Sequence, residues 1–342
     1  MSGKLQSHWT RLTPVSVLLL PLAGMFALAA WIRRLAYSKG WLSSFEVGAP
    51  VIVVGNITAG GSGKTPMVIW LVNWLIEQGW RPGVVSRGYG GNARACVSVA
   101  ADSSPAVVGD EPLLIHHKTQ VPVVVGRDRV AAAQTLLQRH PEVNILVSDD
   151  GLQHYRLRRQ LELAVVDAGT GLGNGLPLPA GPLREPVSRL KTVDALIRIK
   201  RGDSDGCAMP QPYFEAEFLL GDAYALVAPK HKVEPQSLPS DSWAAVTGIG
   251  NPSAFFAMLT QLGWTFTRTV FPDHHRFVPG DIPQTTRVVM TEKDAVKCAS
   301  FARPTWWVVE LAVYPDAALI AFLQSRMRAF FRTASPLDKE AK

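Results

Sequence analysis

The sequence predicts an α/β protein: a mostly parallel sheet with helices on both faces, a smaller C-terminal α/β domain, and an N-terminal hydrophobic helix. Short apolar segments alternate with helical patterns through residues 50–199, which is typical of strands buried on both faces of a parallel sheet. A stretch rich in Pro, Gly, Ser and charge at 201–241 precedes a second strand–helix pattern. An uncharged segment of 21 residues, 12–32, lies near the N-terminus.

The size and composition allow two domains of ordinary size. The 342 residues are 47% hydrophobic and 18% charged, which excludes disordered and collagen-like chains. The three cysteines, Cys96, Cys207 and Cys298, are widely separated and form no CxxC pair, so neither a disulfide framework nor a zinc ribbon is expected. We predict an N-terminal arm at 1–45, a core domain at 46–205, a connecting hairpin or linker at 206–241 and a C-terminal domain at 242–335.

The positive charge is concentrated at the N-terminus. The formal net charge is +7, and five basic residues precede the first acid, Glu46. Residues 46–342 carry 30 basic and 28 acidic side chains, so the body of the protein is close to neutral. We therefore expect no nucleic-acid partner.

The apolar segment 12–32 is just long enough to span a bilayer as a helix. Aromatic and basic residues flank it on both sides, as they do at lipid–water interfaces. A cleaved signal peptide and a buried core helix are alternatives. We favour a membrane anchor that either lies in the interface or spans once, with the body of the protein in the cytoplasm.

Seven strands are expected in the first region, at residues 50–54, 83–86, 95–99, 121–125, 143–148, 161–166 and 193–199. Helical spacing of apolar residues predicts helices at 67–78 and 130–139. A hairpin is expected near 213–225. The second region predicts strands at 243–247, 265–271, 288–291 and 306–311, and helices at 253–262 and 317–331.

The strongest motif is GGSGKT at residues 60–65, between an apolar strand and an apolar helix. This is the context of a P-loop, in which backbone N–H groups surround phosphate oxygens, the lysine reaches the β/γ-phosphates and the hydroxyl ligates Mg²⁺. The predicted fold is therefore P-loop NTPase-like. The general pattern has glycine at position 58, where this chain has threonine. The residues expected to contact the nucleotide are Thr58, Ala59, Gly60, Gly61, Ser62, Gly63, Lys64 and Thr65.

Polar clusters follow several predicted strands, where open α/β sheets bind ligands. Asp149 and Asp150 end an apolar strand, as a metal-binding Walker-B acid does. Other clusters are SRGYGG at 86–91, GDEP at 109–112, GRDR at 126–129 and the loop 178–186. In the second region, DHHRF at 273–277 lacks a third ligand for zinc, and Lys293 either supports a phosphate or belongs to a solvated helix start.

In this order the motifs resemble those of the tetraacyldisaccharide 4′-kinases of lipid A biosynthesis. The resemblance rests on VGNIT at 54–58 leading into GGSGKTP, then SRGYGG, GDEP, DDGLQH at 149–154 and the 178–186 loop. It continues with TGIGNP at 247–252, DHH at 273–275 and TEKD at 291–294. It covers nearly the whole chain, from the hydrophobic arm to about residue 310, and Thr58 looks like the family's own form.

The resemblance implies ATP-dependent phosphorylation of the 4′-hydroxyl of tetraacyldisaccharide 1-phosphate, giving lipid IVA. It also implies Mg²⁺, two α/β domains that close over the nucleotide, and the cytoplasmic face of the bacterial inner membrane as the location. The partners would be a membrane-embedded acylated disaccharide and the lipid surface, with no obligatory protein partner.

Carried over by residue, the resemblance makes Asp110 the catalytic base and His274 the histidine that pairs with it, with the adjacent His275 left open. Lys64 would also be catalytic. The residues expected to govern the metal are Thr65, Glu111, Asp149 and Asp150. The residues expected at the substrate are Arg87, Gln153 and Arg184.

Two rival functions remain open on the sequence. A membrane-recruited P-loop ATPase switch would act on a protein partner, but its signature lysine before the glycine loop is replaced by Ala59. A non-catalytic scaffold would bind ATP without turnover.

Overall fold

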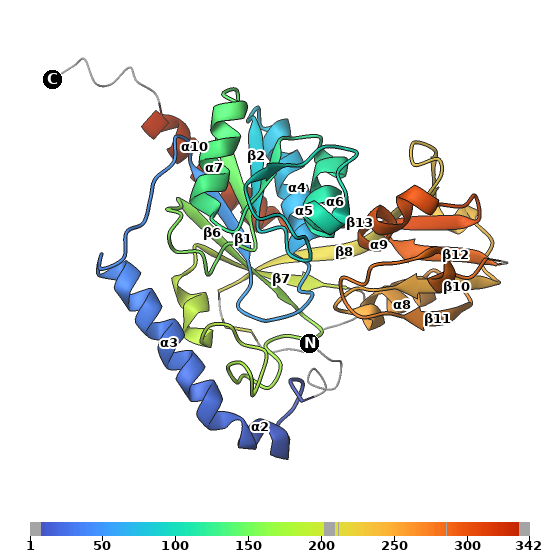
Figure 1. The fold of residues 1–342 in the computed structure, drawn as a ribbon, viewed down its shortest axis with the longest axis horizontal. Helices are drawn as coiled ribbons and strands as arrows, with labels where there is room; N and C mark the ends of the chain where they lie inside the picture. The colour runs from blue at the N-terminus through green and yellow to red at the C-terminus, as the bar shows by residue number, and fades with distance from the viewer. Residues whose placement is uncertain (1–7, 202–208, 211, 285, 335–342) are drawn as a thin grey trace.

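The computed structural model describes residues 8–201, 209–210, 212–284 and 286–334, and it confirms the α/β class. Within these residues one sheet of thirteen strands runs in the order β11-β10-β12-β13-β8-β7-β6-β1-β5-β2-β4-β3, with β9 paired to β8. In Figure 1, helices α4 to α7 surround strands β1–β7, and helices α8 and α9 lie with strands β10–β13. We call these groups the first lobe and the second lobe.

The strands of the first lobe are β1 (Val51–Gly55), β2 (Pro82–Ser86), β3 (Val97–Ser98), β4 (Val123–Val125), β5 (Ile145–Asp149), β6 (Leu161–Asp167) and β7 (Ala195–Lys200). Its helices are α4 (Lys64–Glu77), α5 (Pro105–Val108), α6 (Asp110–Thr119) and α7 (Arg129–Arg139). The second lobe has β10 (Trp243–Thr247), α8 (Pro252–Gln261), β11 (Phe266–Val270), β12 (Arg287–Thr291), α9 (Glu292–Cys298) and β13 (Trp306–Pro315). The remaining elements are α2 (Pro14–Leu18), α3 (Leu20–Ser38), β8 (Phe214–Ala225), β9 (Lys232–Val233) and α10 (Ala317–Ala334).

Strand β1 is the centre of the first lobe and is buried along its whole length. It pairs in parallel with β5 on one side and β6 on the other. Alternate side chains enter different cores: Ile52 packs with Leu71 of α4, and Val53 packs with Leu136 of α7. Because parallel strands end at the same edge, β1, β2 and β5 deliver the residues that follow them to one edge of the sheet.

The hairpin predicted near 213–225 is wrong. This segment is the single strand β8, which pairs in parallel with β7 and antiparallel with β13. Strand β7 pairs with the first residues of the segment, 214–217, and β13 pairs with it from 216 to 225. These distant partners satisfy its backbone groups in an extended conformation. The antiparallel turn lies later, between β8 and β9, where Ala223 pairs with Val233. The sheet is therefore continuous from one lobe to the other.

The sequence predicted a helix at 317–331 within the second region, but the corresponding helix α10 packs on the core of the first lobe. Its buried residues Leu319, Leu323 and Met327 lie in the same core cluster as Phe218 of β8 and Leu71 of α4. The chain thus returns from the second lobe to the core of the first. The division of the chain into four segments remains a prediction.

The remaining predicted elements are present with shifted ends. The strand predicted at 95–99 is reduced to the two residues of β3. The strand predicted at 143–148 is β5, which extends to Asp149. The helix predicted at 67–78 begins three residues earlier, at Lys64, because the glycine loop continues directly into its first turn.

The N-terminal apolar segment forms α2 and α3, which lie along the outside of the first lobe (Figure 1). The buried-helix alternative is wrong, because Ser16 and Ala23 are the buried residues of these two helices. Large apolar side chains are exposed along them, namely Val15, Val17, Leu18, Leu20, Leu22, Met25, Phe26, Leu28, Trp31 and Ile32. Across the described residues, no helix combines the length and apolar character needed to cross a membrane.

Candidate active site

The glycine loop joins β1 to α4, as the motif predicts. Gly63 adopts the left-handed conformation, with φ of 82°, and α4 begins at the next residue. A Cβ on Gly63 would lie 2.7 Å from the ring of Phe218, so both the backbone angle and the neighbouring ring require glycine here. The Lys64 ammonium donates to Asn56 Oδ1 at 3.3 Å. It is thereby held over the loop.

A second loop, residues 178–186, supports the glycine loop. The Ala59 N–H donates to the Pro182 carbonyl at 2.8 Å, and the Arg184 N–H donates to the Ile57 carbonyl at 2.7 Å. The Gln153 amide donates to the Asn56 carbonyl and to Glu185 Oε1, both at 2.9 Å. These contacts fix the position of the backbone in front of α4.

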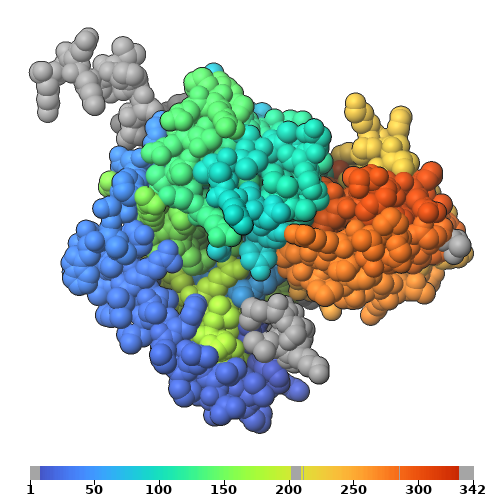
Figure 2. Space-filling view, viewed as in Figure 1, coloured from blue at the N-terminus to red at the C-terminus, as the bar shows by residue number. Residues whose placement is uncertain are grey.

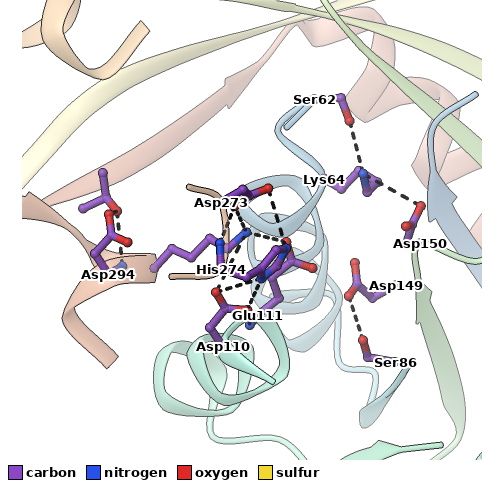
Figure 3. A network of polar contacts seen from close by, with 12 residues as sticks. Ser62, Lys64, Ser86, Asp110, Glu111, Asp149, Asp150, Asp273, His274 and Asp294 are labelled. Atoms are coloured by element: carbon purple, nitrogen blue, oxygen red, sulfur yellow. Dashed lines mark hydrogen bonds and ion pairs between the residues drawn. The ribbon is translucent and has the colours of Figure 1, made fainter. Parts of the chain in front are cut away.

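The two acids that end β5 lie beside Lys64 (Figure 3). Asp149 accepts a hydrogen bond from Ser86 Oγ at 2.9 Å. Asp150 accepts from Arg184 at 2.9 Å and lies 3.8 Å from the Lys64 ammonium. The Oδ1 atoms of both acids are buried and accept no hydrogen bond from the described residues. Two buried carboxylate oxygens without donors suit a bound cation.

The pKa of Asp149 is raised and that of Asp150 is lowered. Burial raises the pKa of Asp149 to about 7, and the charges of Glu111 and Asp150 add to this effect. Burial also opposes ionisation of Asp150, but Lys64 and Arg184 outweigh it and lower the pKa of that carboxyl. A divalent cation would favour the ionised form of both.

The four predicted metal residues do not form one protein cage. Among the described residues, no group of three or more His, Cys, Asp and Glu side chains could hold a metal ion. Asp149 and Asp150 lie together and Thr65 is in the first turn of α4, whereas Glu111 Oε1 accepts from Lys293 at 2.9 Å. Magnesium rarely uses a cage, because it keeps several waters and binds one or two carboxylates plus substrate phosphates.

A second cluster lies where the lobes meet (Figure 3). Asp110 begins α6 and is 4% exposed. His274 Nδ1, from the second lobe, lies 2.9 Å from Asp110 Oδ1 and 3.1 Å from Oδ2. Burial alone would raise the pKa of Asp110, but the His274 hydrogen bond and the nearby Lys293 and Lys297 lower it. The carboxyl group is therefore an ionised acceptor.

Tight backbone packing presents Asp110 to the second lobe. Gly109 has a φ of 91°, and a Cβ there would lie 2.7 Å from the Tyr89 carbonyl. The SRGYGG and GDEP loops are thus pressed together. The Tyr89 ring also packs on the His274 ring, with centroids 4.8 Å apart.

The geometry separates the two adjacent histidines. His274 has a φ of 60°, an uncommon angle for a non-glycine residue, and faces Asp110. His275 Nε2 instead lies 2.9 Å from Asp281 Oδ2, and its ring stacks on Phe271. The sequence left this choice open because adjacent residues in a loop share every sequence signal.

Around Asp110, the sequence left the role of Lys293 open and assigned none to Lys297. The Lys293 ammonium lies 2.9 Å from Glu111, 3.2 Å from Asp273 and 4.0 Å from Asp110 Oδ2. Lys297, one turn further along α9, lies 3.9 Å from the same oxygen. Their spacing of four residues on a predicted helix start was the available signal.

The two predicted substrate arginines have different surroundings. Arg87 is exposed after β2, whereas Arg184 is part-buried and bound to Asp150. A further arginine, Arg129 of α7, is 3% exposed and donates to the carbonyls of Gly126 and Asp149. Burial lowers the pKa of Arg129 to about 10, although the two acids at the end of β5 oppose the shift.

The second lobe also touches the glycine loop. A Cβ on Gly250 would lie 2.8 Å from the Gly61 nitrogen and 3.2 Å from Asp273 Oδ2. In Figure 2 the surfaces of the two lobes meet directly. The acid cluster and the glycine loop therefore form one site with walls from both lobes.

The chain matches a protein-family model described as tetraacyldisaccharide-1-P 4′-kinase over residues 15–328. It is 58% identical to a tetraacyldisaccharide 4′-kinase of Thiobacillus denitrificans, over 93% of this chain and 97% of the relative. It is 50% identical to one of an Azoarcus species, over 88% and 89% of the two chains.

A crystal structure of LpxK from Aquifex aeolicus, in complex with ATP, has a similar fold. Its TM-score with this chain is 0.78 at 26% sequence identity, with 92% of this chain and 99% of the other covered. The family predicted from the motifs is thereby confirmed.

The close approach of Gly250 to the glycine loop yields a test. Gly250→Ala should weaken the binding of an ATP analogue about tenfold or more, because the new Cβ displaces either the Gly61 amide or the whole second-lobe loop. Isothermal titration calorimetry measures the effect. Gly280→Ala is the matched control, since a Cβ there meets no atom within 4 Å. Equal affinities of the two variants would contradict the contact.

Proposed function

The chain belongs to the tetraacyldisaccharide-1-P 4′-kinase family, and we propose on this basis how its own residues perform that activity. The chain is an ATP-dependent lipid kinase that transfers the γ-phosphate to the 4′-hydroxyl of tetraacyldisaccharide 1-phosphate, which gives lipid IVA. The observation that carries the proposal is the Asp110–His274 pair at 2.9 Å, formed between the lobes in the same site as a P-loop.

The glycine loop binds the triphosphate. Residues 60–65 offer backbone N–H groups and the N-terminus of α4, which favours negative charge, whereas the Ala59 N–H is bound to Pro182. The Lys64 ammonium, held by Asn56, contacts the β- and γ-phosphate oxygens. Arg184 neutralises Asp150 beside them.

Magnesium fits the pair of buried oxygens on Asp149 and Asp150, with the Thr65 hydroxyl as a further ligand. The ion would supply charge neutralisation for the phosphate oxygens. Glu111 is held by Lys293, so we place it at the outer edge of the metal site.

Asp110 orients the sugar hydroxyl. Its Oδ1 atom accepts from the Glu111 N–H at 3.0 Å and lies within 2.9 Å of His274. Its Oδ2 atom has longer contacts, and both lysines are 3.9 to 4.0 Å away. We assign Oδ2 as the acceptor of the 4′-hydroxyl proton. Phosphoryl transfer has a loose transition state, so a carboxylate with a low pKa is a sufficient base.

His274 Nδ1 lies nearer to Oδ1, at 2.9 Å, than to Oδ2, at 3.1 Å. The histidine therefore orients the carboxylate mainly through Oδ1 and leaves Oδ2 with the weaker contact. Both N–H groups of the Gln153 amide are used within the protein. We therefore propose that Gln153 acts on substrate indirectly, by fixing the glycine loop. Arg87, exposed at the edge of the site, is the candidate for the substrate phosphate.

The position of the apolar helix fits a lipid substrate. Leu22, Met25 and Phe26 of α3 line a cavity of about 460 Å³ together with Leu178 and Pro179. The same 178–186 loop contacts the glycine loop through Pro182. A single loop thus connects the exposed apolar helix with the phosphate site. We propose that α2 and α3 lie in the cytoplasmic interface of the inner membrane.

The direct test of the activity is incubation with labelled ATP and tetraacyldisaccharide 1-phosphate. The label should enter the lipid with the wild-type chain, and Lys64→Ala should lower the rate about 10²- to 10³-fold, because it removes a charged contact to the transferred group. Lys230→Ala, exposed between β8 and β9, is the control. Label that appears only as inorganic phosphate would favour the ATPase switch, and ATP binding without turnover would favour the scaffold.

The interfacial helix is tested on vesicles of phosphatidylethanolamine and phosphatidylglycerol. Leu22→Asp with Met25→Asp should lower the partition coefficient roughly tenfold or more, since each buried apolar side chain contributes about 1.5–3 kcal/mol. The matched control is Val270→Asp with Val278→Asp, because these second-lobe valines are 54% and 55% exposed, against 53% for Leu22. Equal sedimentation of both double variants with vesicles would refute the proposal that α3 binds the membrane interface.

A further inference from the structure

We propose that Lys293 is a positioning residue of the phosphoryl transfer: its ammonium gathers Asp110, Glu111 and Asp273 so that the acceptor carboxylate is aligned only when the two lobes are in contact. This inference rests on the proposed function, because it assigns a role within that same site.

The contacts of Lys293 cross between the lobes. Its ammonium comes from α9 of the second lobe and reaches Glu111 and Asp110 at the start of α6 in the first. It also lies 3.2 Å from Asp273, which precedes His274 in the second lobe. The side chain is only 16% exposed. One cation therefore links the acceptor carboxylate, its neighbour and the loop that carries the paired histidine.

Charge balance gives this position its importance. Three carboxylates within about 4 Å of one ammonium would repel each other without it. The second ammonium nearby, that of Lys297, is 2.7 Å from Asp294 and is therefore already paired. Without Lys293, repulsion would push the carboxylates of Asp110 and Glu111 apart, and Asp110 Oδ2 would no longer point toward the sugar hydroxyl.

Buried hydrogen bonds anchor the start of helix α9, which carries Lys293. Asp294, the next residue, is fully buried and accepts from Thr247 Oγ1 at 2.9 Å and from the Gly248 N–H at 3.1 Å. These residues begin the loop that reaches Gly61 through Gly250. The element that carries Lys293 is thus tied to the same loop that touches the phosphate site.

A second lysine, Lys118, distinguishes the alignment of Asp110 from a simple ionic contact between the lobes. Lys118, near the other end of α6, lies 2.7 Å from both Glu292 of α9 and Glu310 of β13. This ion pair joins the same two helices, and it has no contact with Asp110 in the described residues. If ionic contact between α6 and α9 were all that mattered, loss of either lysine would have the same effect on the reaction.

The experiment compares Lys293→Met, Lys293→Arg and Lys118→Met in the full-length protein. Initial rates of label transfer to the lipid are measured per site that binds an ATP analogue, so misfolded protein is not counted. Lys293→Met should lower kcat about 10²-fold, the scale of a misaligned reacting group, with KM for ATP within about threefold of wild type. Lys293→Arg should recover at least about tenfold of that loss, and Lys118→Met should change kcat by less than about threefold.

Three results would overturn the inference. These are a wild-type kcat in Lys293→Met, equal losses of kcat in Lys293→Met and Lys118→Met, or no recovery in Lys293→Arg. Absence of lipid labelling by the wild-type chain would instead reject the proposed function, so the two failures are distinguishable.

Discussion

The contact between Asp110 and His274 is the interaction on which the rest of the site depends. Asp110 begins a helix of the first lobe, and His274 lies in a loop of the second, 164 residues later. Neither lobe alone contains the pair. The positive φ of His274, uncommon for a non-glycine residue, indicates that its loop is held in a conformation that serves this contact.

The fold gives the two lobes a common frame. Strand β8 extends the parallel sheet of the first lobe and then pairs with β13 of the second. Helix α10 returns from β13 to the first core, where Leu323 is fully buried. The loops after β10 and β11 meet the first lobe, where Gly250 lies against Gly61 and His274 against Asp110. The acceptor acid therefore lies in the same site as the phosphate loop.

Much of this organisation could be predicted from the sequence. The glycine loop and the acids after β5 follow local rules, in which an apolar strand ends in residues of a known chemical type. The hairpin near 213–225 failed because its strand is stabilised by partners far along the chain, which local composition does not reveal. The role of Lys293 and the choice between His274 and His275 stayed open for the same reason. Each role depends on which first-lobe residues the side chain contacts, and the local sequence does not show these contacts.

The most direct test of this account is a double-mutant cycle on kcat for label transfer to the lipid, using Asp110→Ala, His274→Ala and the double variant. If the two residues act as one unit across the lobes, the double variant should be no slower than Asp110→Ala alone. Losses that simply multiply would contradict the account, because they would show that the histidine and the carboxylate act independently.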